Sequence, residues 1–306
     1  MVRSGPANHP GSAGRAPDTR RVESRPGIGR QPRRILRSVE ARRPDPGTEA
    51  PPLLEASGLS RSFRGLQALV DYKLRLAPLT IHGVIGPNGA GKTTLFHLLS
   101  GFLRPSSGTI AFEGRDITGS AASSVSRMGI GRTFQNIRLF GELSVLDNVK
   151  VALQRQAPRS LVGTLISSPS FRRGERELET RALELLELFG LAGQRDRAAR
   201  NLPYGDQRRL EIARAVGIRP KLLLLDEPNA GMNPIETQEL LGLIRRLRDE
   251  LGITIVLVAH DIPLVMNLCD RIQVLNDGRL IAEGDPAAVR ADRDVIAAYL
   301  GQARHA

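Results

Sequence analysis

The segment GPNGAGKT, at residues 86–93, is the strongest indication of the fold of this 306-residue chain. It matches the pattern G-x-x-x-x-G-K-[ST] and lies between a strand predicted at 80–85 and a helix predicted at 94–100. Its glycines let main-chain N–H groups turn toward phosphate oxygens, and the helix directs its positive end at the same anion. Lys92 is expected to neutralise the β and γ phosphates of a nucleotide, and the Thr93 hydroxyl to ligate Mg²⁺. The predicted nucleotide-binding residues here are Gly86, Pro87, Asn88, Gly89, Ala90, Gly91, Lys92, Thr93 and Thr94.

A second stretch, LLLLDEP at 222–228, supplies the carboxylates that such a loop requires. Its four consecutive leucines suit a strand that is covered on both faces, which we predict at 221–226. Asp226 is expected to hold Mg²⁺, and Glu227 to orient or deprotonate the attacking water. An Asp-Glu pair after a strand is by itself more often a solvated turn, but the phosphate loop favours the functional interpretation.

From residue 53 onward, short apolar segments alternate with helical patterns, which indicates an α/β fold. We predict a P-loop NTPase core of the RecA-like type, with a largely parallel sheet, antiparallel β elements and an inserted helical subdomain. A third strand, rich in β-branched residues, is expected at 253–259. The subdomain is expected at about 136–206, where one helical face is formed by Leu178, Ala182, Leu185 and Phe189.

The predicted domain covers residues 53–301, with tails at 1–52 and 302–306. Residues 1–50 contain 11 Arg, 5 acidic residues and seven of the 20 prolines without a strand or helix period, so we expect disorder. This segment holds half of the net charge of +12. A contact with anionic lipid or nucleic acid is therefore one interpretation of it, and a misplaced start codon is another. It contains no apolar core of about 7 to 15 residues, which argues against a secretory signal.

The overall composition, 41% apolar and 25% charged, is that of a soluble globular domain. No uninterrupted apolar run reaches about 18 residues, so we expect a membrane role only through partners. The single cysteine, Cys269, has no second thiol in the chain with which to form a disulfide, which fits a reducing compartment. We interpret it as a small buried apolar residue near a helix end.

Together with three further motifs, these stretches resemble the ATP-binding cassette (ABC) proteins that drive membrane transport. RTFQN at 132–136 is similar to the Q-loop of that family. This resemblance implies that Gln135 contacts Mg²⁺ and the lytic water and joins the core to the helical subdomain. LPYGDQ at 202–207 resembles the family signature, which closes over ATP bound to the opposite subunit. The residues implied in that contact are Tyr204 and Gly205.

The remaining motifs extend the resemblance. VAHD places His260 at a strand end, similar to the switch histidine that contacts the γ-phosphate, although a lone histidine there is more often structural. NAGMNP at 229–234 resembles the D-loop, which crosses the dimer interface. Phe63 occupies the position of the aromatic residue that stacks on adenine, with core packing as the alternative.

The signature, the D-loop and the segment DVIAAYLG at 294–301 resemble one subgroup, the ATP-binding subunits of importers for branched-chain amino acids and related amides. The implied cofactors are ATP and Mg²⁺. The implied partners are a second cassette, two membrane permease subunits and, indirectly, an extracytoplasmic binding protein, at the cytoplasmic face of the inner membrane. Nucleic acid is not expected. The alternatives are a soluble ABC-type ATPase that acts on nucleic acid or ribosomes, and an inactive nucleotide sensor.

The signature departs from the commonest family form, LSGGQ, because Pro203 stands where a serine hydroxyl would contact the γ-phosphate. Proline is tolerated at the first helical position, where we place it, so the turn keeps its fold. We expect Pro203→Ser to keep or raise the ATPase activity, because it adds a donor. Steady-state phosphate release measures this, and a clear loss would mean that the proline has a role of its own.

Overall fold

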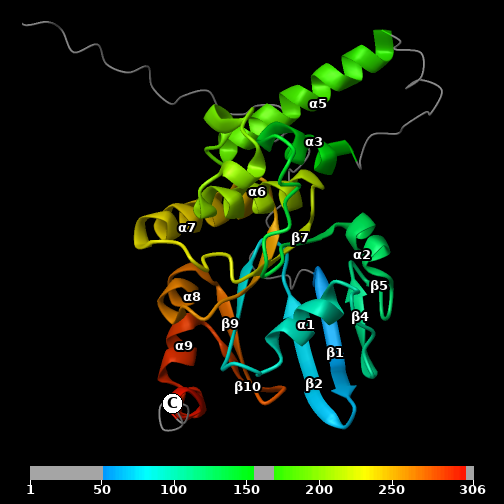
Figure 1. Cartoon of the computed structure of the whole chain (residues 1–306). Coiled ribbons are helices and arrows are strands. Elements are labelled where there is room, and N and C mark those ends of the chain that lie inside the picture. Colours follow the sequence, from blue (N-terminus) through cyan, green and yellow to red (C-terminus); the bar gives the residue numbers. More distant parts are fainter. Residues whose placement is uncertain (1–50, 155–168, 301–306) are drawn as a thin grey trace, which may run out of the picture.

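The computed structural model describes residues 51–154 and 169–300, which form two sheets with helices around them (Figure 1). The first sheet is antiparallel, in the order β2-β1-β4-β5. Its strands are β1 (Leu54–Phe63), β2 (Leu66–Leu76), β4 (Ser107–Phe112) and β5 (Arg115–Asp116). The second sheet has the order β10-β9-β3-β8-β7-β6. Its strands are β3 (Ile81–Ile85), β6 (Ile130–Arg132), β7 (Leu222–Asp226), β8 (Thr254–Val258), β9 (Arg271–Asn276) and β10 (Arg279–Gly284).

Every pairing in the second sheet is parallel except the one between β9 and β10. The predicted α/β class with antiparallel elements is therefore confirmed. The three predicted strands are present as β3, β7 and β8, each shortened by one or two residues at its ends.

The helices surround the second sheet and extend beyond one end of it. α3, α5 and α6 lie together at that end, and the sheet of β1, β2 and β4 lies at the opposite end (Figure 1). No helix within the described residues is both long and apolar enough to cross a membrane. The helices are α1 (Lys92–Leu99), α2 (Ala122–Met128), α3 (Val145–Gln154), α5 (Pro169–Leu188), α6 (Tyr204–Gly217), α7 (Pro234–Asp249), α8 (Ile262–Leu268), α9 (Pro286–Ala291) and α10 (Arg293–Leu300), with 3₁₀ turns at Ala192–Gln194 and Ala199–Asn201.

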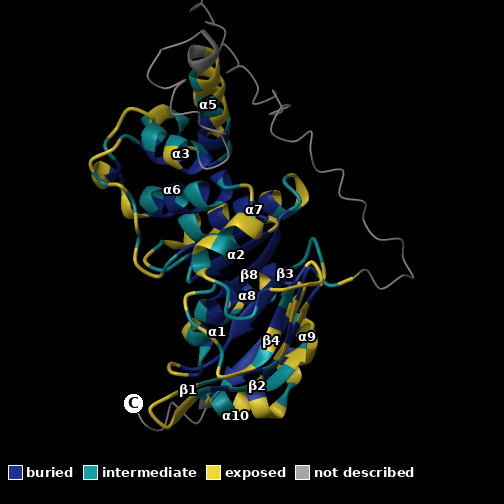
Figure 2. Ribbon diagram, turned by 90° about the vertical axis from the view of Figure 1, so that its right-hand side faces the viewer, coloured by how far each residue is buried: buried dark blue, intermediate teal, exposed yellow. Residues whose placement is uncertain are grey.

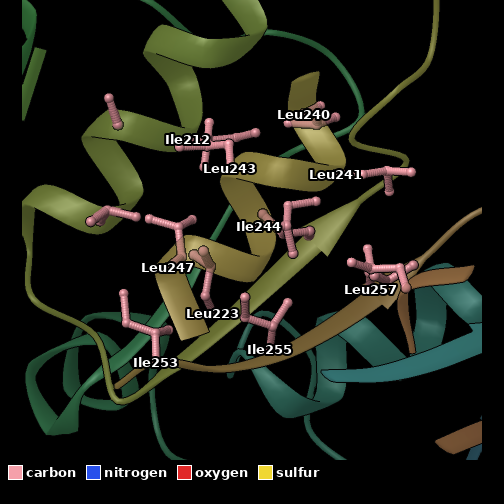
Figure 3. Packing of buried hydrophobic residues seen from close by; sticks show 14 of the residues in the cluster. Ile212, Leu223, Leu240, Leu241, Leu243, Ile244, Leu247, Ile253, Ile255 and Leu257 are labelled. Atoms are coloured by element: carbon pink, nitrogen blue, oxygen red, sulfur yellow. The ribbon is translucent and has the colours of Figure 1, made fainter. Parts of the chain in front are cut away.

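Strand β7 is buried on both faces, as its leucines predict. Leu222 and Leu224 belong to a core shared with β1, β2 and α1, whereas Leu223 and Leu225 belong to a core shared with α6, α7 and α8. Successive side chains of a strand point to opposite faces, so one apolar run joins two cores. Figure 2 shows these central strands as buried, and Figure 3 shows α7 packing its leucines over Leu223.

The helical segment between β6 and β7 packs through the predicted apolar face. Ala182, Leu185 and Phe189 are buried, and Leu178 packs against the same core. Helix α3 lies beside α5 and α6 and supplies Val145 and other residues to this cluster. The segment is therefore an extension of the core of the second sheet.

The predicted start of the helix after the phosphate loop is also wrong: α1 begins at Lys92, two residues earlier. Gly91 adopts a φ of 101° at the cap position, so the chain enters the helix without a spacer. Lys92 and Thr93 are thus helical residues. At the other end of the chain, α9 starts after Asp285, whose side chain caps the helix, and is followed by α10. The predicted tails lie outside the described residues, except for residues 51 and 52.

Candidate functional site

The candidate site lies where three neighbouring parallel strands end. In the registers of β3, β8 and β7, Val84 pairs with Val258, and Val258 pairs with Asp226. The phosphate loop follows β3, Glu227 follows β7, and His260 comes two residues after β8. Because carboxyl ends of parallel strands meet at one edge of a sheet, the fold brings these predicted residues together.

Two glycines of the loop lie too close to neighbouring backbone for a side chain. A Cβ atom at Gly86 would lie 2.1 Å from the carbonyl oxygen of Leu275 in β9. One at Gly91 would lie 2.5 Å from the carbonyl oxygen of Ala68 in β2. The loop is thus fitted between two strands, which fixes the direction of its N–H groups.

Lys92 is buried inside the loop, with 6% of its surface exposed. Its ammonium group donates hydrogen bonds to the carbonyl oxygens of Gly86 and Pro87, at 2.6 and 2.7 Å. Burial lowers the pKa of Lys92, while the negative charges of Glu227 and Asp226 act in the opposite direction. A cation held in a loop beside two carboxylates suits an anionic ligand that carries a divalent metal.

Asp226 is held by Arg132, a residue for which no role was predicted. Its Oδ2 atom lies 3.0 Å from Nη2 of Arg132, and both side chains are 5% exposed. Arg132 also donates through Nη1 to the hydroxyl of Ser100 at 3.0 Å. Its guanidinium group lies within 6 Å of three aromatic ring centroids, those of Phe96, Phe102 and Phe134. Asp226 therefore has one oxygen engaged by a fixed cation.

Glu227 and His260 contact each other directly. Oε1 of Glu227 lies 2.6 Å from Nε2 of His260. The backbone of Glu227 has a φ of 47°, in the left-handed region that residues other than glycine seldom adopt. Its N–H donates to the carbonyl oxygen of Val258 at 2.9 Å, which anchors the turn to β8. Such a strained conformation at a carboxylate is typical of functional sites, where the surrounding structure holds it.

The signature and the D-loop lie against each other, away from the phosphate loop. A Cβ atom at Gly231 would lie 2.8 Å from Cε1 of Tyr204, and one at Gly205 would lie 2.9 Å from Oε1 of Glu236. α6 and α1 are separated in both views (Figures 1 and 2). Pro203 occupies the N-cap of α6, not its first helical position as predicted, because Tyr204 begins the helix. Helix α6, which begins at Tyr204, and helix α1, which begins at Lys92, thus lie apart within the same chain.

Two further predicted residues are exposed. Phe63 ends β1 with 38% of its surface exposed, and the guanidinium carbon of Arg61 lies 4.7 Å from its ring centroid. The exposure of Phe63 argues against the alternative that its ring packs in the core. Gln135 is exposed in the loop after β6. Both positions leave the side chains open to a ligand or a partner.

The residues present fit Mg²⁺ bound together with a nucleotide. Asp226 supplies a carboxylate and the exposed Thr93 supplies a hydroxyl group. No cluster of three or more His, Cys, Asp or Glu side chains that could cage a metal occurs in residues 51–154 and 169–300. Mg²⁺ is usually held by one or two carboxylates and substrate phosphates, not by an all-protein cage, so this sparse donor set suits it.

Comparisons with known proteins agree with this geometry. Residues 69–230 match the family model "ABC transporter", and residues 279–305 match "Branched-chain amino acid ATP-binding cassette transporter". The chain is 48% identical over 252 residues to LivG of Escherichia coli, a high-affinity branched-chain amino acid transport ATP-binding protein. It is 45% identical over 252 residues to BraF of Pseudomonas aeruginosa, which has the same description. Each alignment covers 82% of this chain and 99% of the relative.

Solved structures show the same architecture. MJ1267, an ATP-binding cassette of an ABC transporter in its ADP conformation, aligns with a TM-score of 0.71 and 30% identity, covering 82% of this chain and 100% of that one. CbiO1 of Clostridium perfringens, part of the ABC transporter complex cbiONQ, aligns with a TM-score of 0.69 and 30% identity, covering 81% and 94% of the two chains.

Proposed function

Because this chain belongs to the ABC transporter family as an ATP-hydrolysing subunit, we propose that it drives the import of branched-chain amino acids. The observation that carries the proposal is the meeting of Lys92, Asp226, Glu227 and His260 at one sheet edge. The substrate class rests on the LivG and BraF relatives and on the match at residues 279–305. The alternatives that act on nucleic acid or only sense nucleotide find no support among these relatives.

Each group at the edge has a distinct proposed task. The loop from Gly86 and the ammonium of Lys92 bind the phosphates of ATP, and Asp226, Thr93 and Gln135 hold Mg²⁺. When bound, Mg²⁺ would neutralise part of the negative charge of the phosphates. Glu227 lies beside His260 and orients or deprotonates the attacking water, while His260 contacts the γ-phosphate. The exposed ring of Phe63 stacks on adenine.

The separation of the signature from the phosphate loop supports a head-to-tail pair of cassettes. Tyr204 and Gly205 begin α6 with the positive end of its dipole, which favours an anion. Since that end lies apart from Lys92 of the same chain, it serves ATP bound to a second subunit. ABC ATP-binding subunits work as dimers with membrane permeases, and this chain would join such a complex peripherally, at the cytoplasmic face of the inner membrane. An extracytoplasmic binding protein would deliver the amino acid.

A groove between the sheet and the helical segment is the proposed contact for the permease. Its volume is about 820 Å³, and apolar and basic side chains line it together. Three aromatic residues, Phe102, Phe134 and Phe140, lie beside Arg138 and Arg214. The groove also includes Arg132, so a segment seated in it would contact the residue that holds Asp226.

We expect Phe140→Asp to prevent assembly with the permeases while ATP binding by the free subunit stays unchanged. Phe140 is 47% exposed, so the change buries no new charge in the fold, but it removes an aromatic ring from the groove and places a carboxylate beside Arg214 there. Co-purification with the permeases measures assembly. Leu66→Asp, at an exposed apolar residue outside the groove, is the matched control. If Phe140→Asp co-purifies with the permeases as the wild type does, the groove is not the permease contact.

The substrate class is tested in vesicles that contain this subunit, its permeases and its binding protein. We expect leucine, isoleucine or valine to stimulate ATP turnover and to accumulate inside. Stimulation by an amide and by none of these three amino acids would contradict the proposal.

A further inference from the structure

A buried arginine, Arg208, connects α6, the helix that begins in the signature, to the turn of Asp226 and Glu227 in the same chain. Arg208 lies one helical turn after Tyr204, the first residue of α6, and its side chain is fully buried. A buried guanidinium group needs partners for its donors, because an uncompensated charge in the protein interior is costly. The partners of Arg208 therefore indicate what the residue is for.

Four oxygen atoms accept hydrogen bonds from Arg208, and three belong to backbone carbonyls outside α6. Nη2 donates to the carbonyl oxygens of Asp226 at 2.6 Å and Glu227 at 2.8 Å. Nη1 donates to the carbonyl oxygen of Phe134 at 2.6 Å, in the loop that carries Gln135. The guanidinium group of Arg208 thus joins α6 to two segments that contain proposed metal ligands, the turn of Asp226 and the loop of Gln135.

Glu211 completes the arrangement from the next turn of the helix. Its Oε2 accepts from Nη1 of Arg208 at 2.6 Å, and its Oε1 accepts from the N–H of Phe134 at 3.2 Å. Burial raises the pKa of Glu211, and the positive charge of Arg208 opposes that rise. The pair therefore grips Phe134 by both its N–H and its carbonyl group.

We propose that Arg208, fixed by Glu211, is a positioning residue that transmits the position of the signature helix to the turn bearing Glu227. This proposal rests on the proposed head-to-tail dimer, in which the start of α6 contacts ATP of the second subunit. A shift of α6 on that contact moves the carbonyl groups of Asp226 and Glu227, and hence the carboxylate that acts on the ATP of its own chain. Arg208 thereby couples the two ATP sites of the dimer.

The backbone of Glu227 supports a positioning role. Its φ of 47° lies in the left-handed region, and Arg208 donates to the carbonyl group of this residue, so the bond holds the turn in this conformation. An arginine that served packing alone would not need to place two donors on the carbonyls of the two carboxylate residues. Lysine cannot reproduce this fork, because its single ammonium group lacks the planar donor geometry.

The test compares ATP binding and turnover of the full chain carrying Arg208→Lys. We expect the same ATP affinity and binding stoichiometry, a kcat lower by about 10- to 100-fold, as for a slightly misplaced catalytic group, and a Hill coefficient for ATP that falls toward one. Arg246→Lys is the matched control, since Arg246 is exposed on α7 and pairs with Glu250. A folded Arg208→Lys protein with wild-type kcat and Hill coefficient overturns the proposal.

A second variant guards against misfolding. Arg208→Gln combined with Glu211→Gln removes both charges together, so no unpaired buried charge remains. We expect its melting temperature to stay nearer to the wild type than that of Arg208→Gln alone, with kcat and cooperativity still reduced. Recovery of both kinetic values in the double variant would overturn the proposal. An incorrect substrate class would leave these ATPase measurements unaffected, whereas wild-type protein without ATP turnover would overturn the proposed function itself.

Discussion

Glu227→Gln should leave ATP binding intact while lowering turnover by about 10²- to 10⁴-fold, the usual contribution of a positioned general base. The amide keeps the size of the side chain and its place beside His260, which lies 2.6 Å away, but it cannot accept a proton from water. The binding groups, Lys92 and the loop from Gly86, are unchanged. Equilibrium binding of ATP with Mg²⁺ and single-turnover phosphate release measure the two effects separately.

Glu187→Gln is the matched control, because this carboxylate is exposed on α5 and belongs to no part of the site. Its turnover should equal that of the wild type. If Glu227→Gln also hydrolyses ATP at the wild-type rate, another group activates the water. Reduced ATP binding by Glu227→Gln would instead mean that Glu227 is a ligand-binding residue.

The sequence alone predicts an element correctly where neighbouring residues encode its backbone geometry. The phosphate loop is of this kind, because Gly86, Gly91 and Lys92 lie within seven consecutive residues. The four leucines of β7 are another example, because alternation along a strand places them in two cores. Both features depend on local pattern, and both were predicted.

The residues that hold the carboxylates could not be found in this way, because their partners are distant in sequence. Arg132 and Asp226 are 94 positions apart, and Arg208 and Asp226 are 18 apart. A basic residue at the end of a short strand gives a weak signal until β6 is known to pair with β7, which sets Arg132 opposite Leu224. The start of α1 was misplaced for the opposite reason, since the cap conformation of Gly91 begins the helix inside the motif.

These long-range contacts explain why the site depends on the whole fold. Asp226 is held through its side chain by Arg132 and through its carbonyl group by Arg208. Arg132 lines the proposed permease groove, and Arg208 belongs to α6, the helix that begins in the signature. The turn of Asp226 and Glu227 is therefore connected by hydrogen bonds to both surfaces that are proposed to meet partners.

Lys92→Met should weaken ATP binding itself, in contrast to Glu227→Gln. Charge-assisted hydrogen bonds contribute about 1.5–3 kcal/mol, which corresponds to a roughly 10- to 150-fold rise in Kd. Methionine keeps an apolar stem of similar length in the buried position, so the change removes mainly the ammonium group. Calorimetric titration with ATP and Mg²⁺ measures the loss.

Because Lys92 also donates hydrogen bonds within the loop, the stability of the loop is measured separately. Its ammonium donates to the carbonyl oxygens of Gly86 and Pro87, so its removal also frees two acceptors. The melting temperature of the nucleotide-free variant reports that effect apart from binding. Lys73→Met, at an exposed lysine of β2, is the control and should bind ATP as the wild type does. If Lys92→Met binds ATP with unchanged Kd, the triphosphate lies elsewhere, and the roles proposed for Asp226 and Glu227 lose their basis with it.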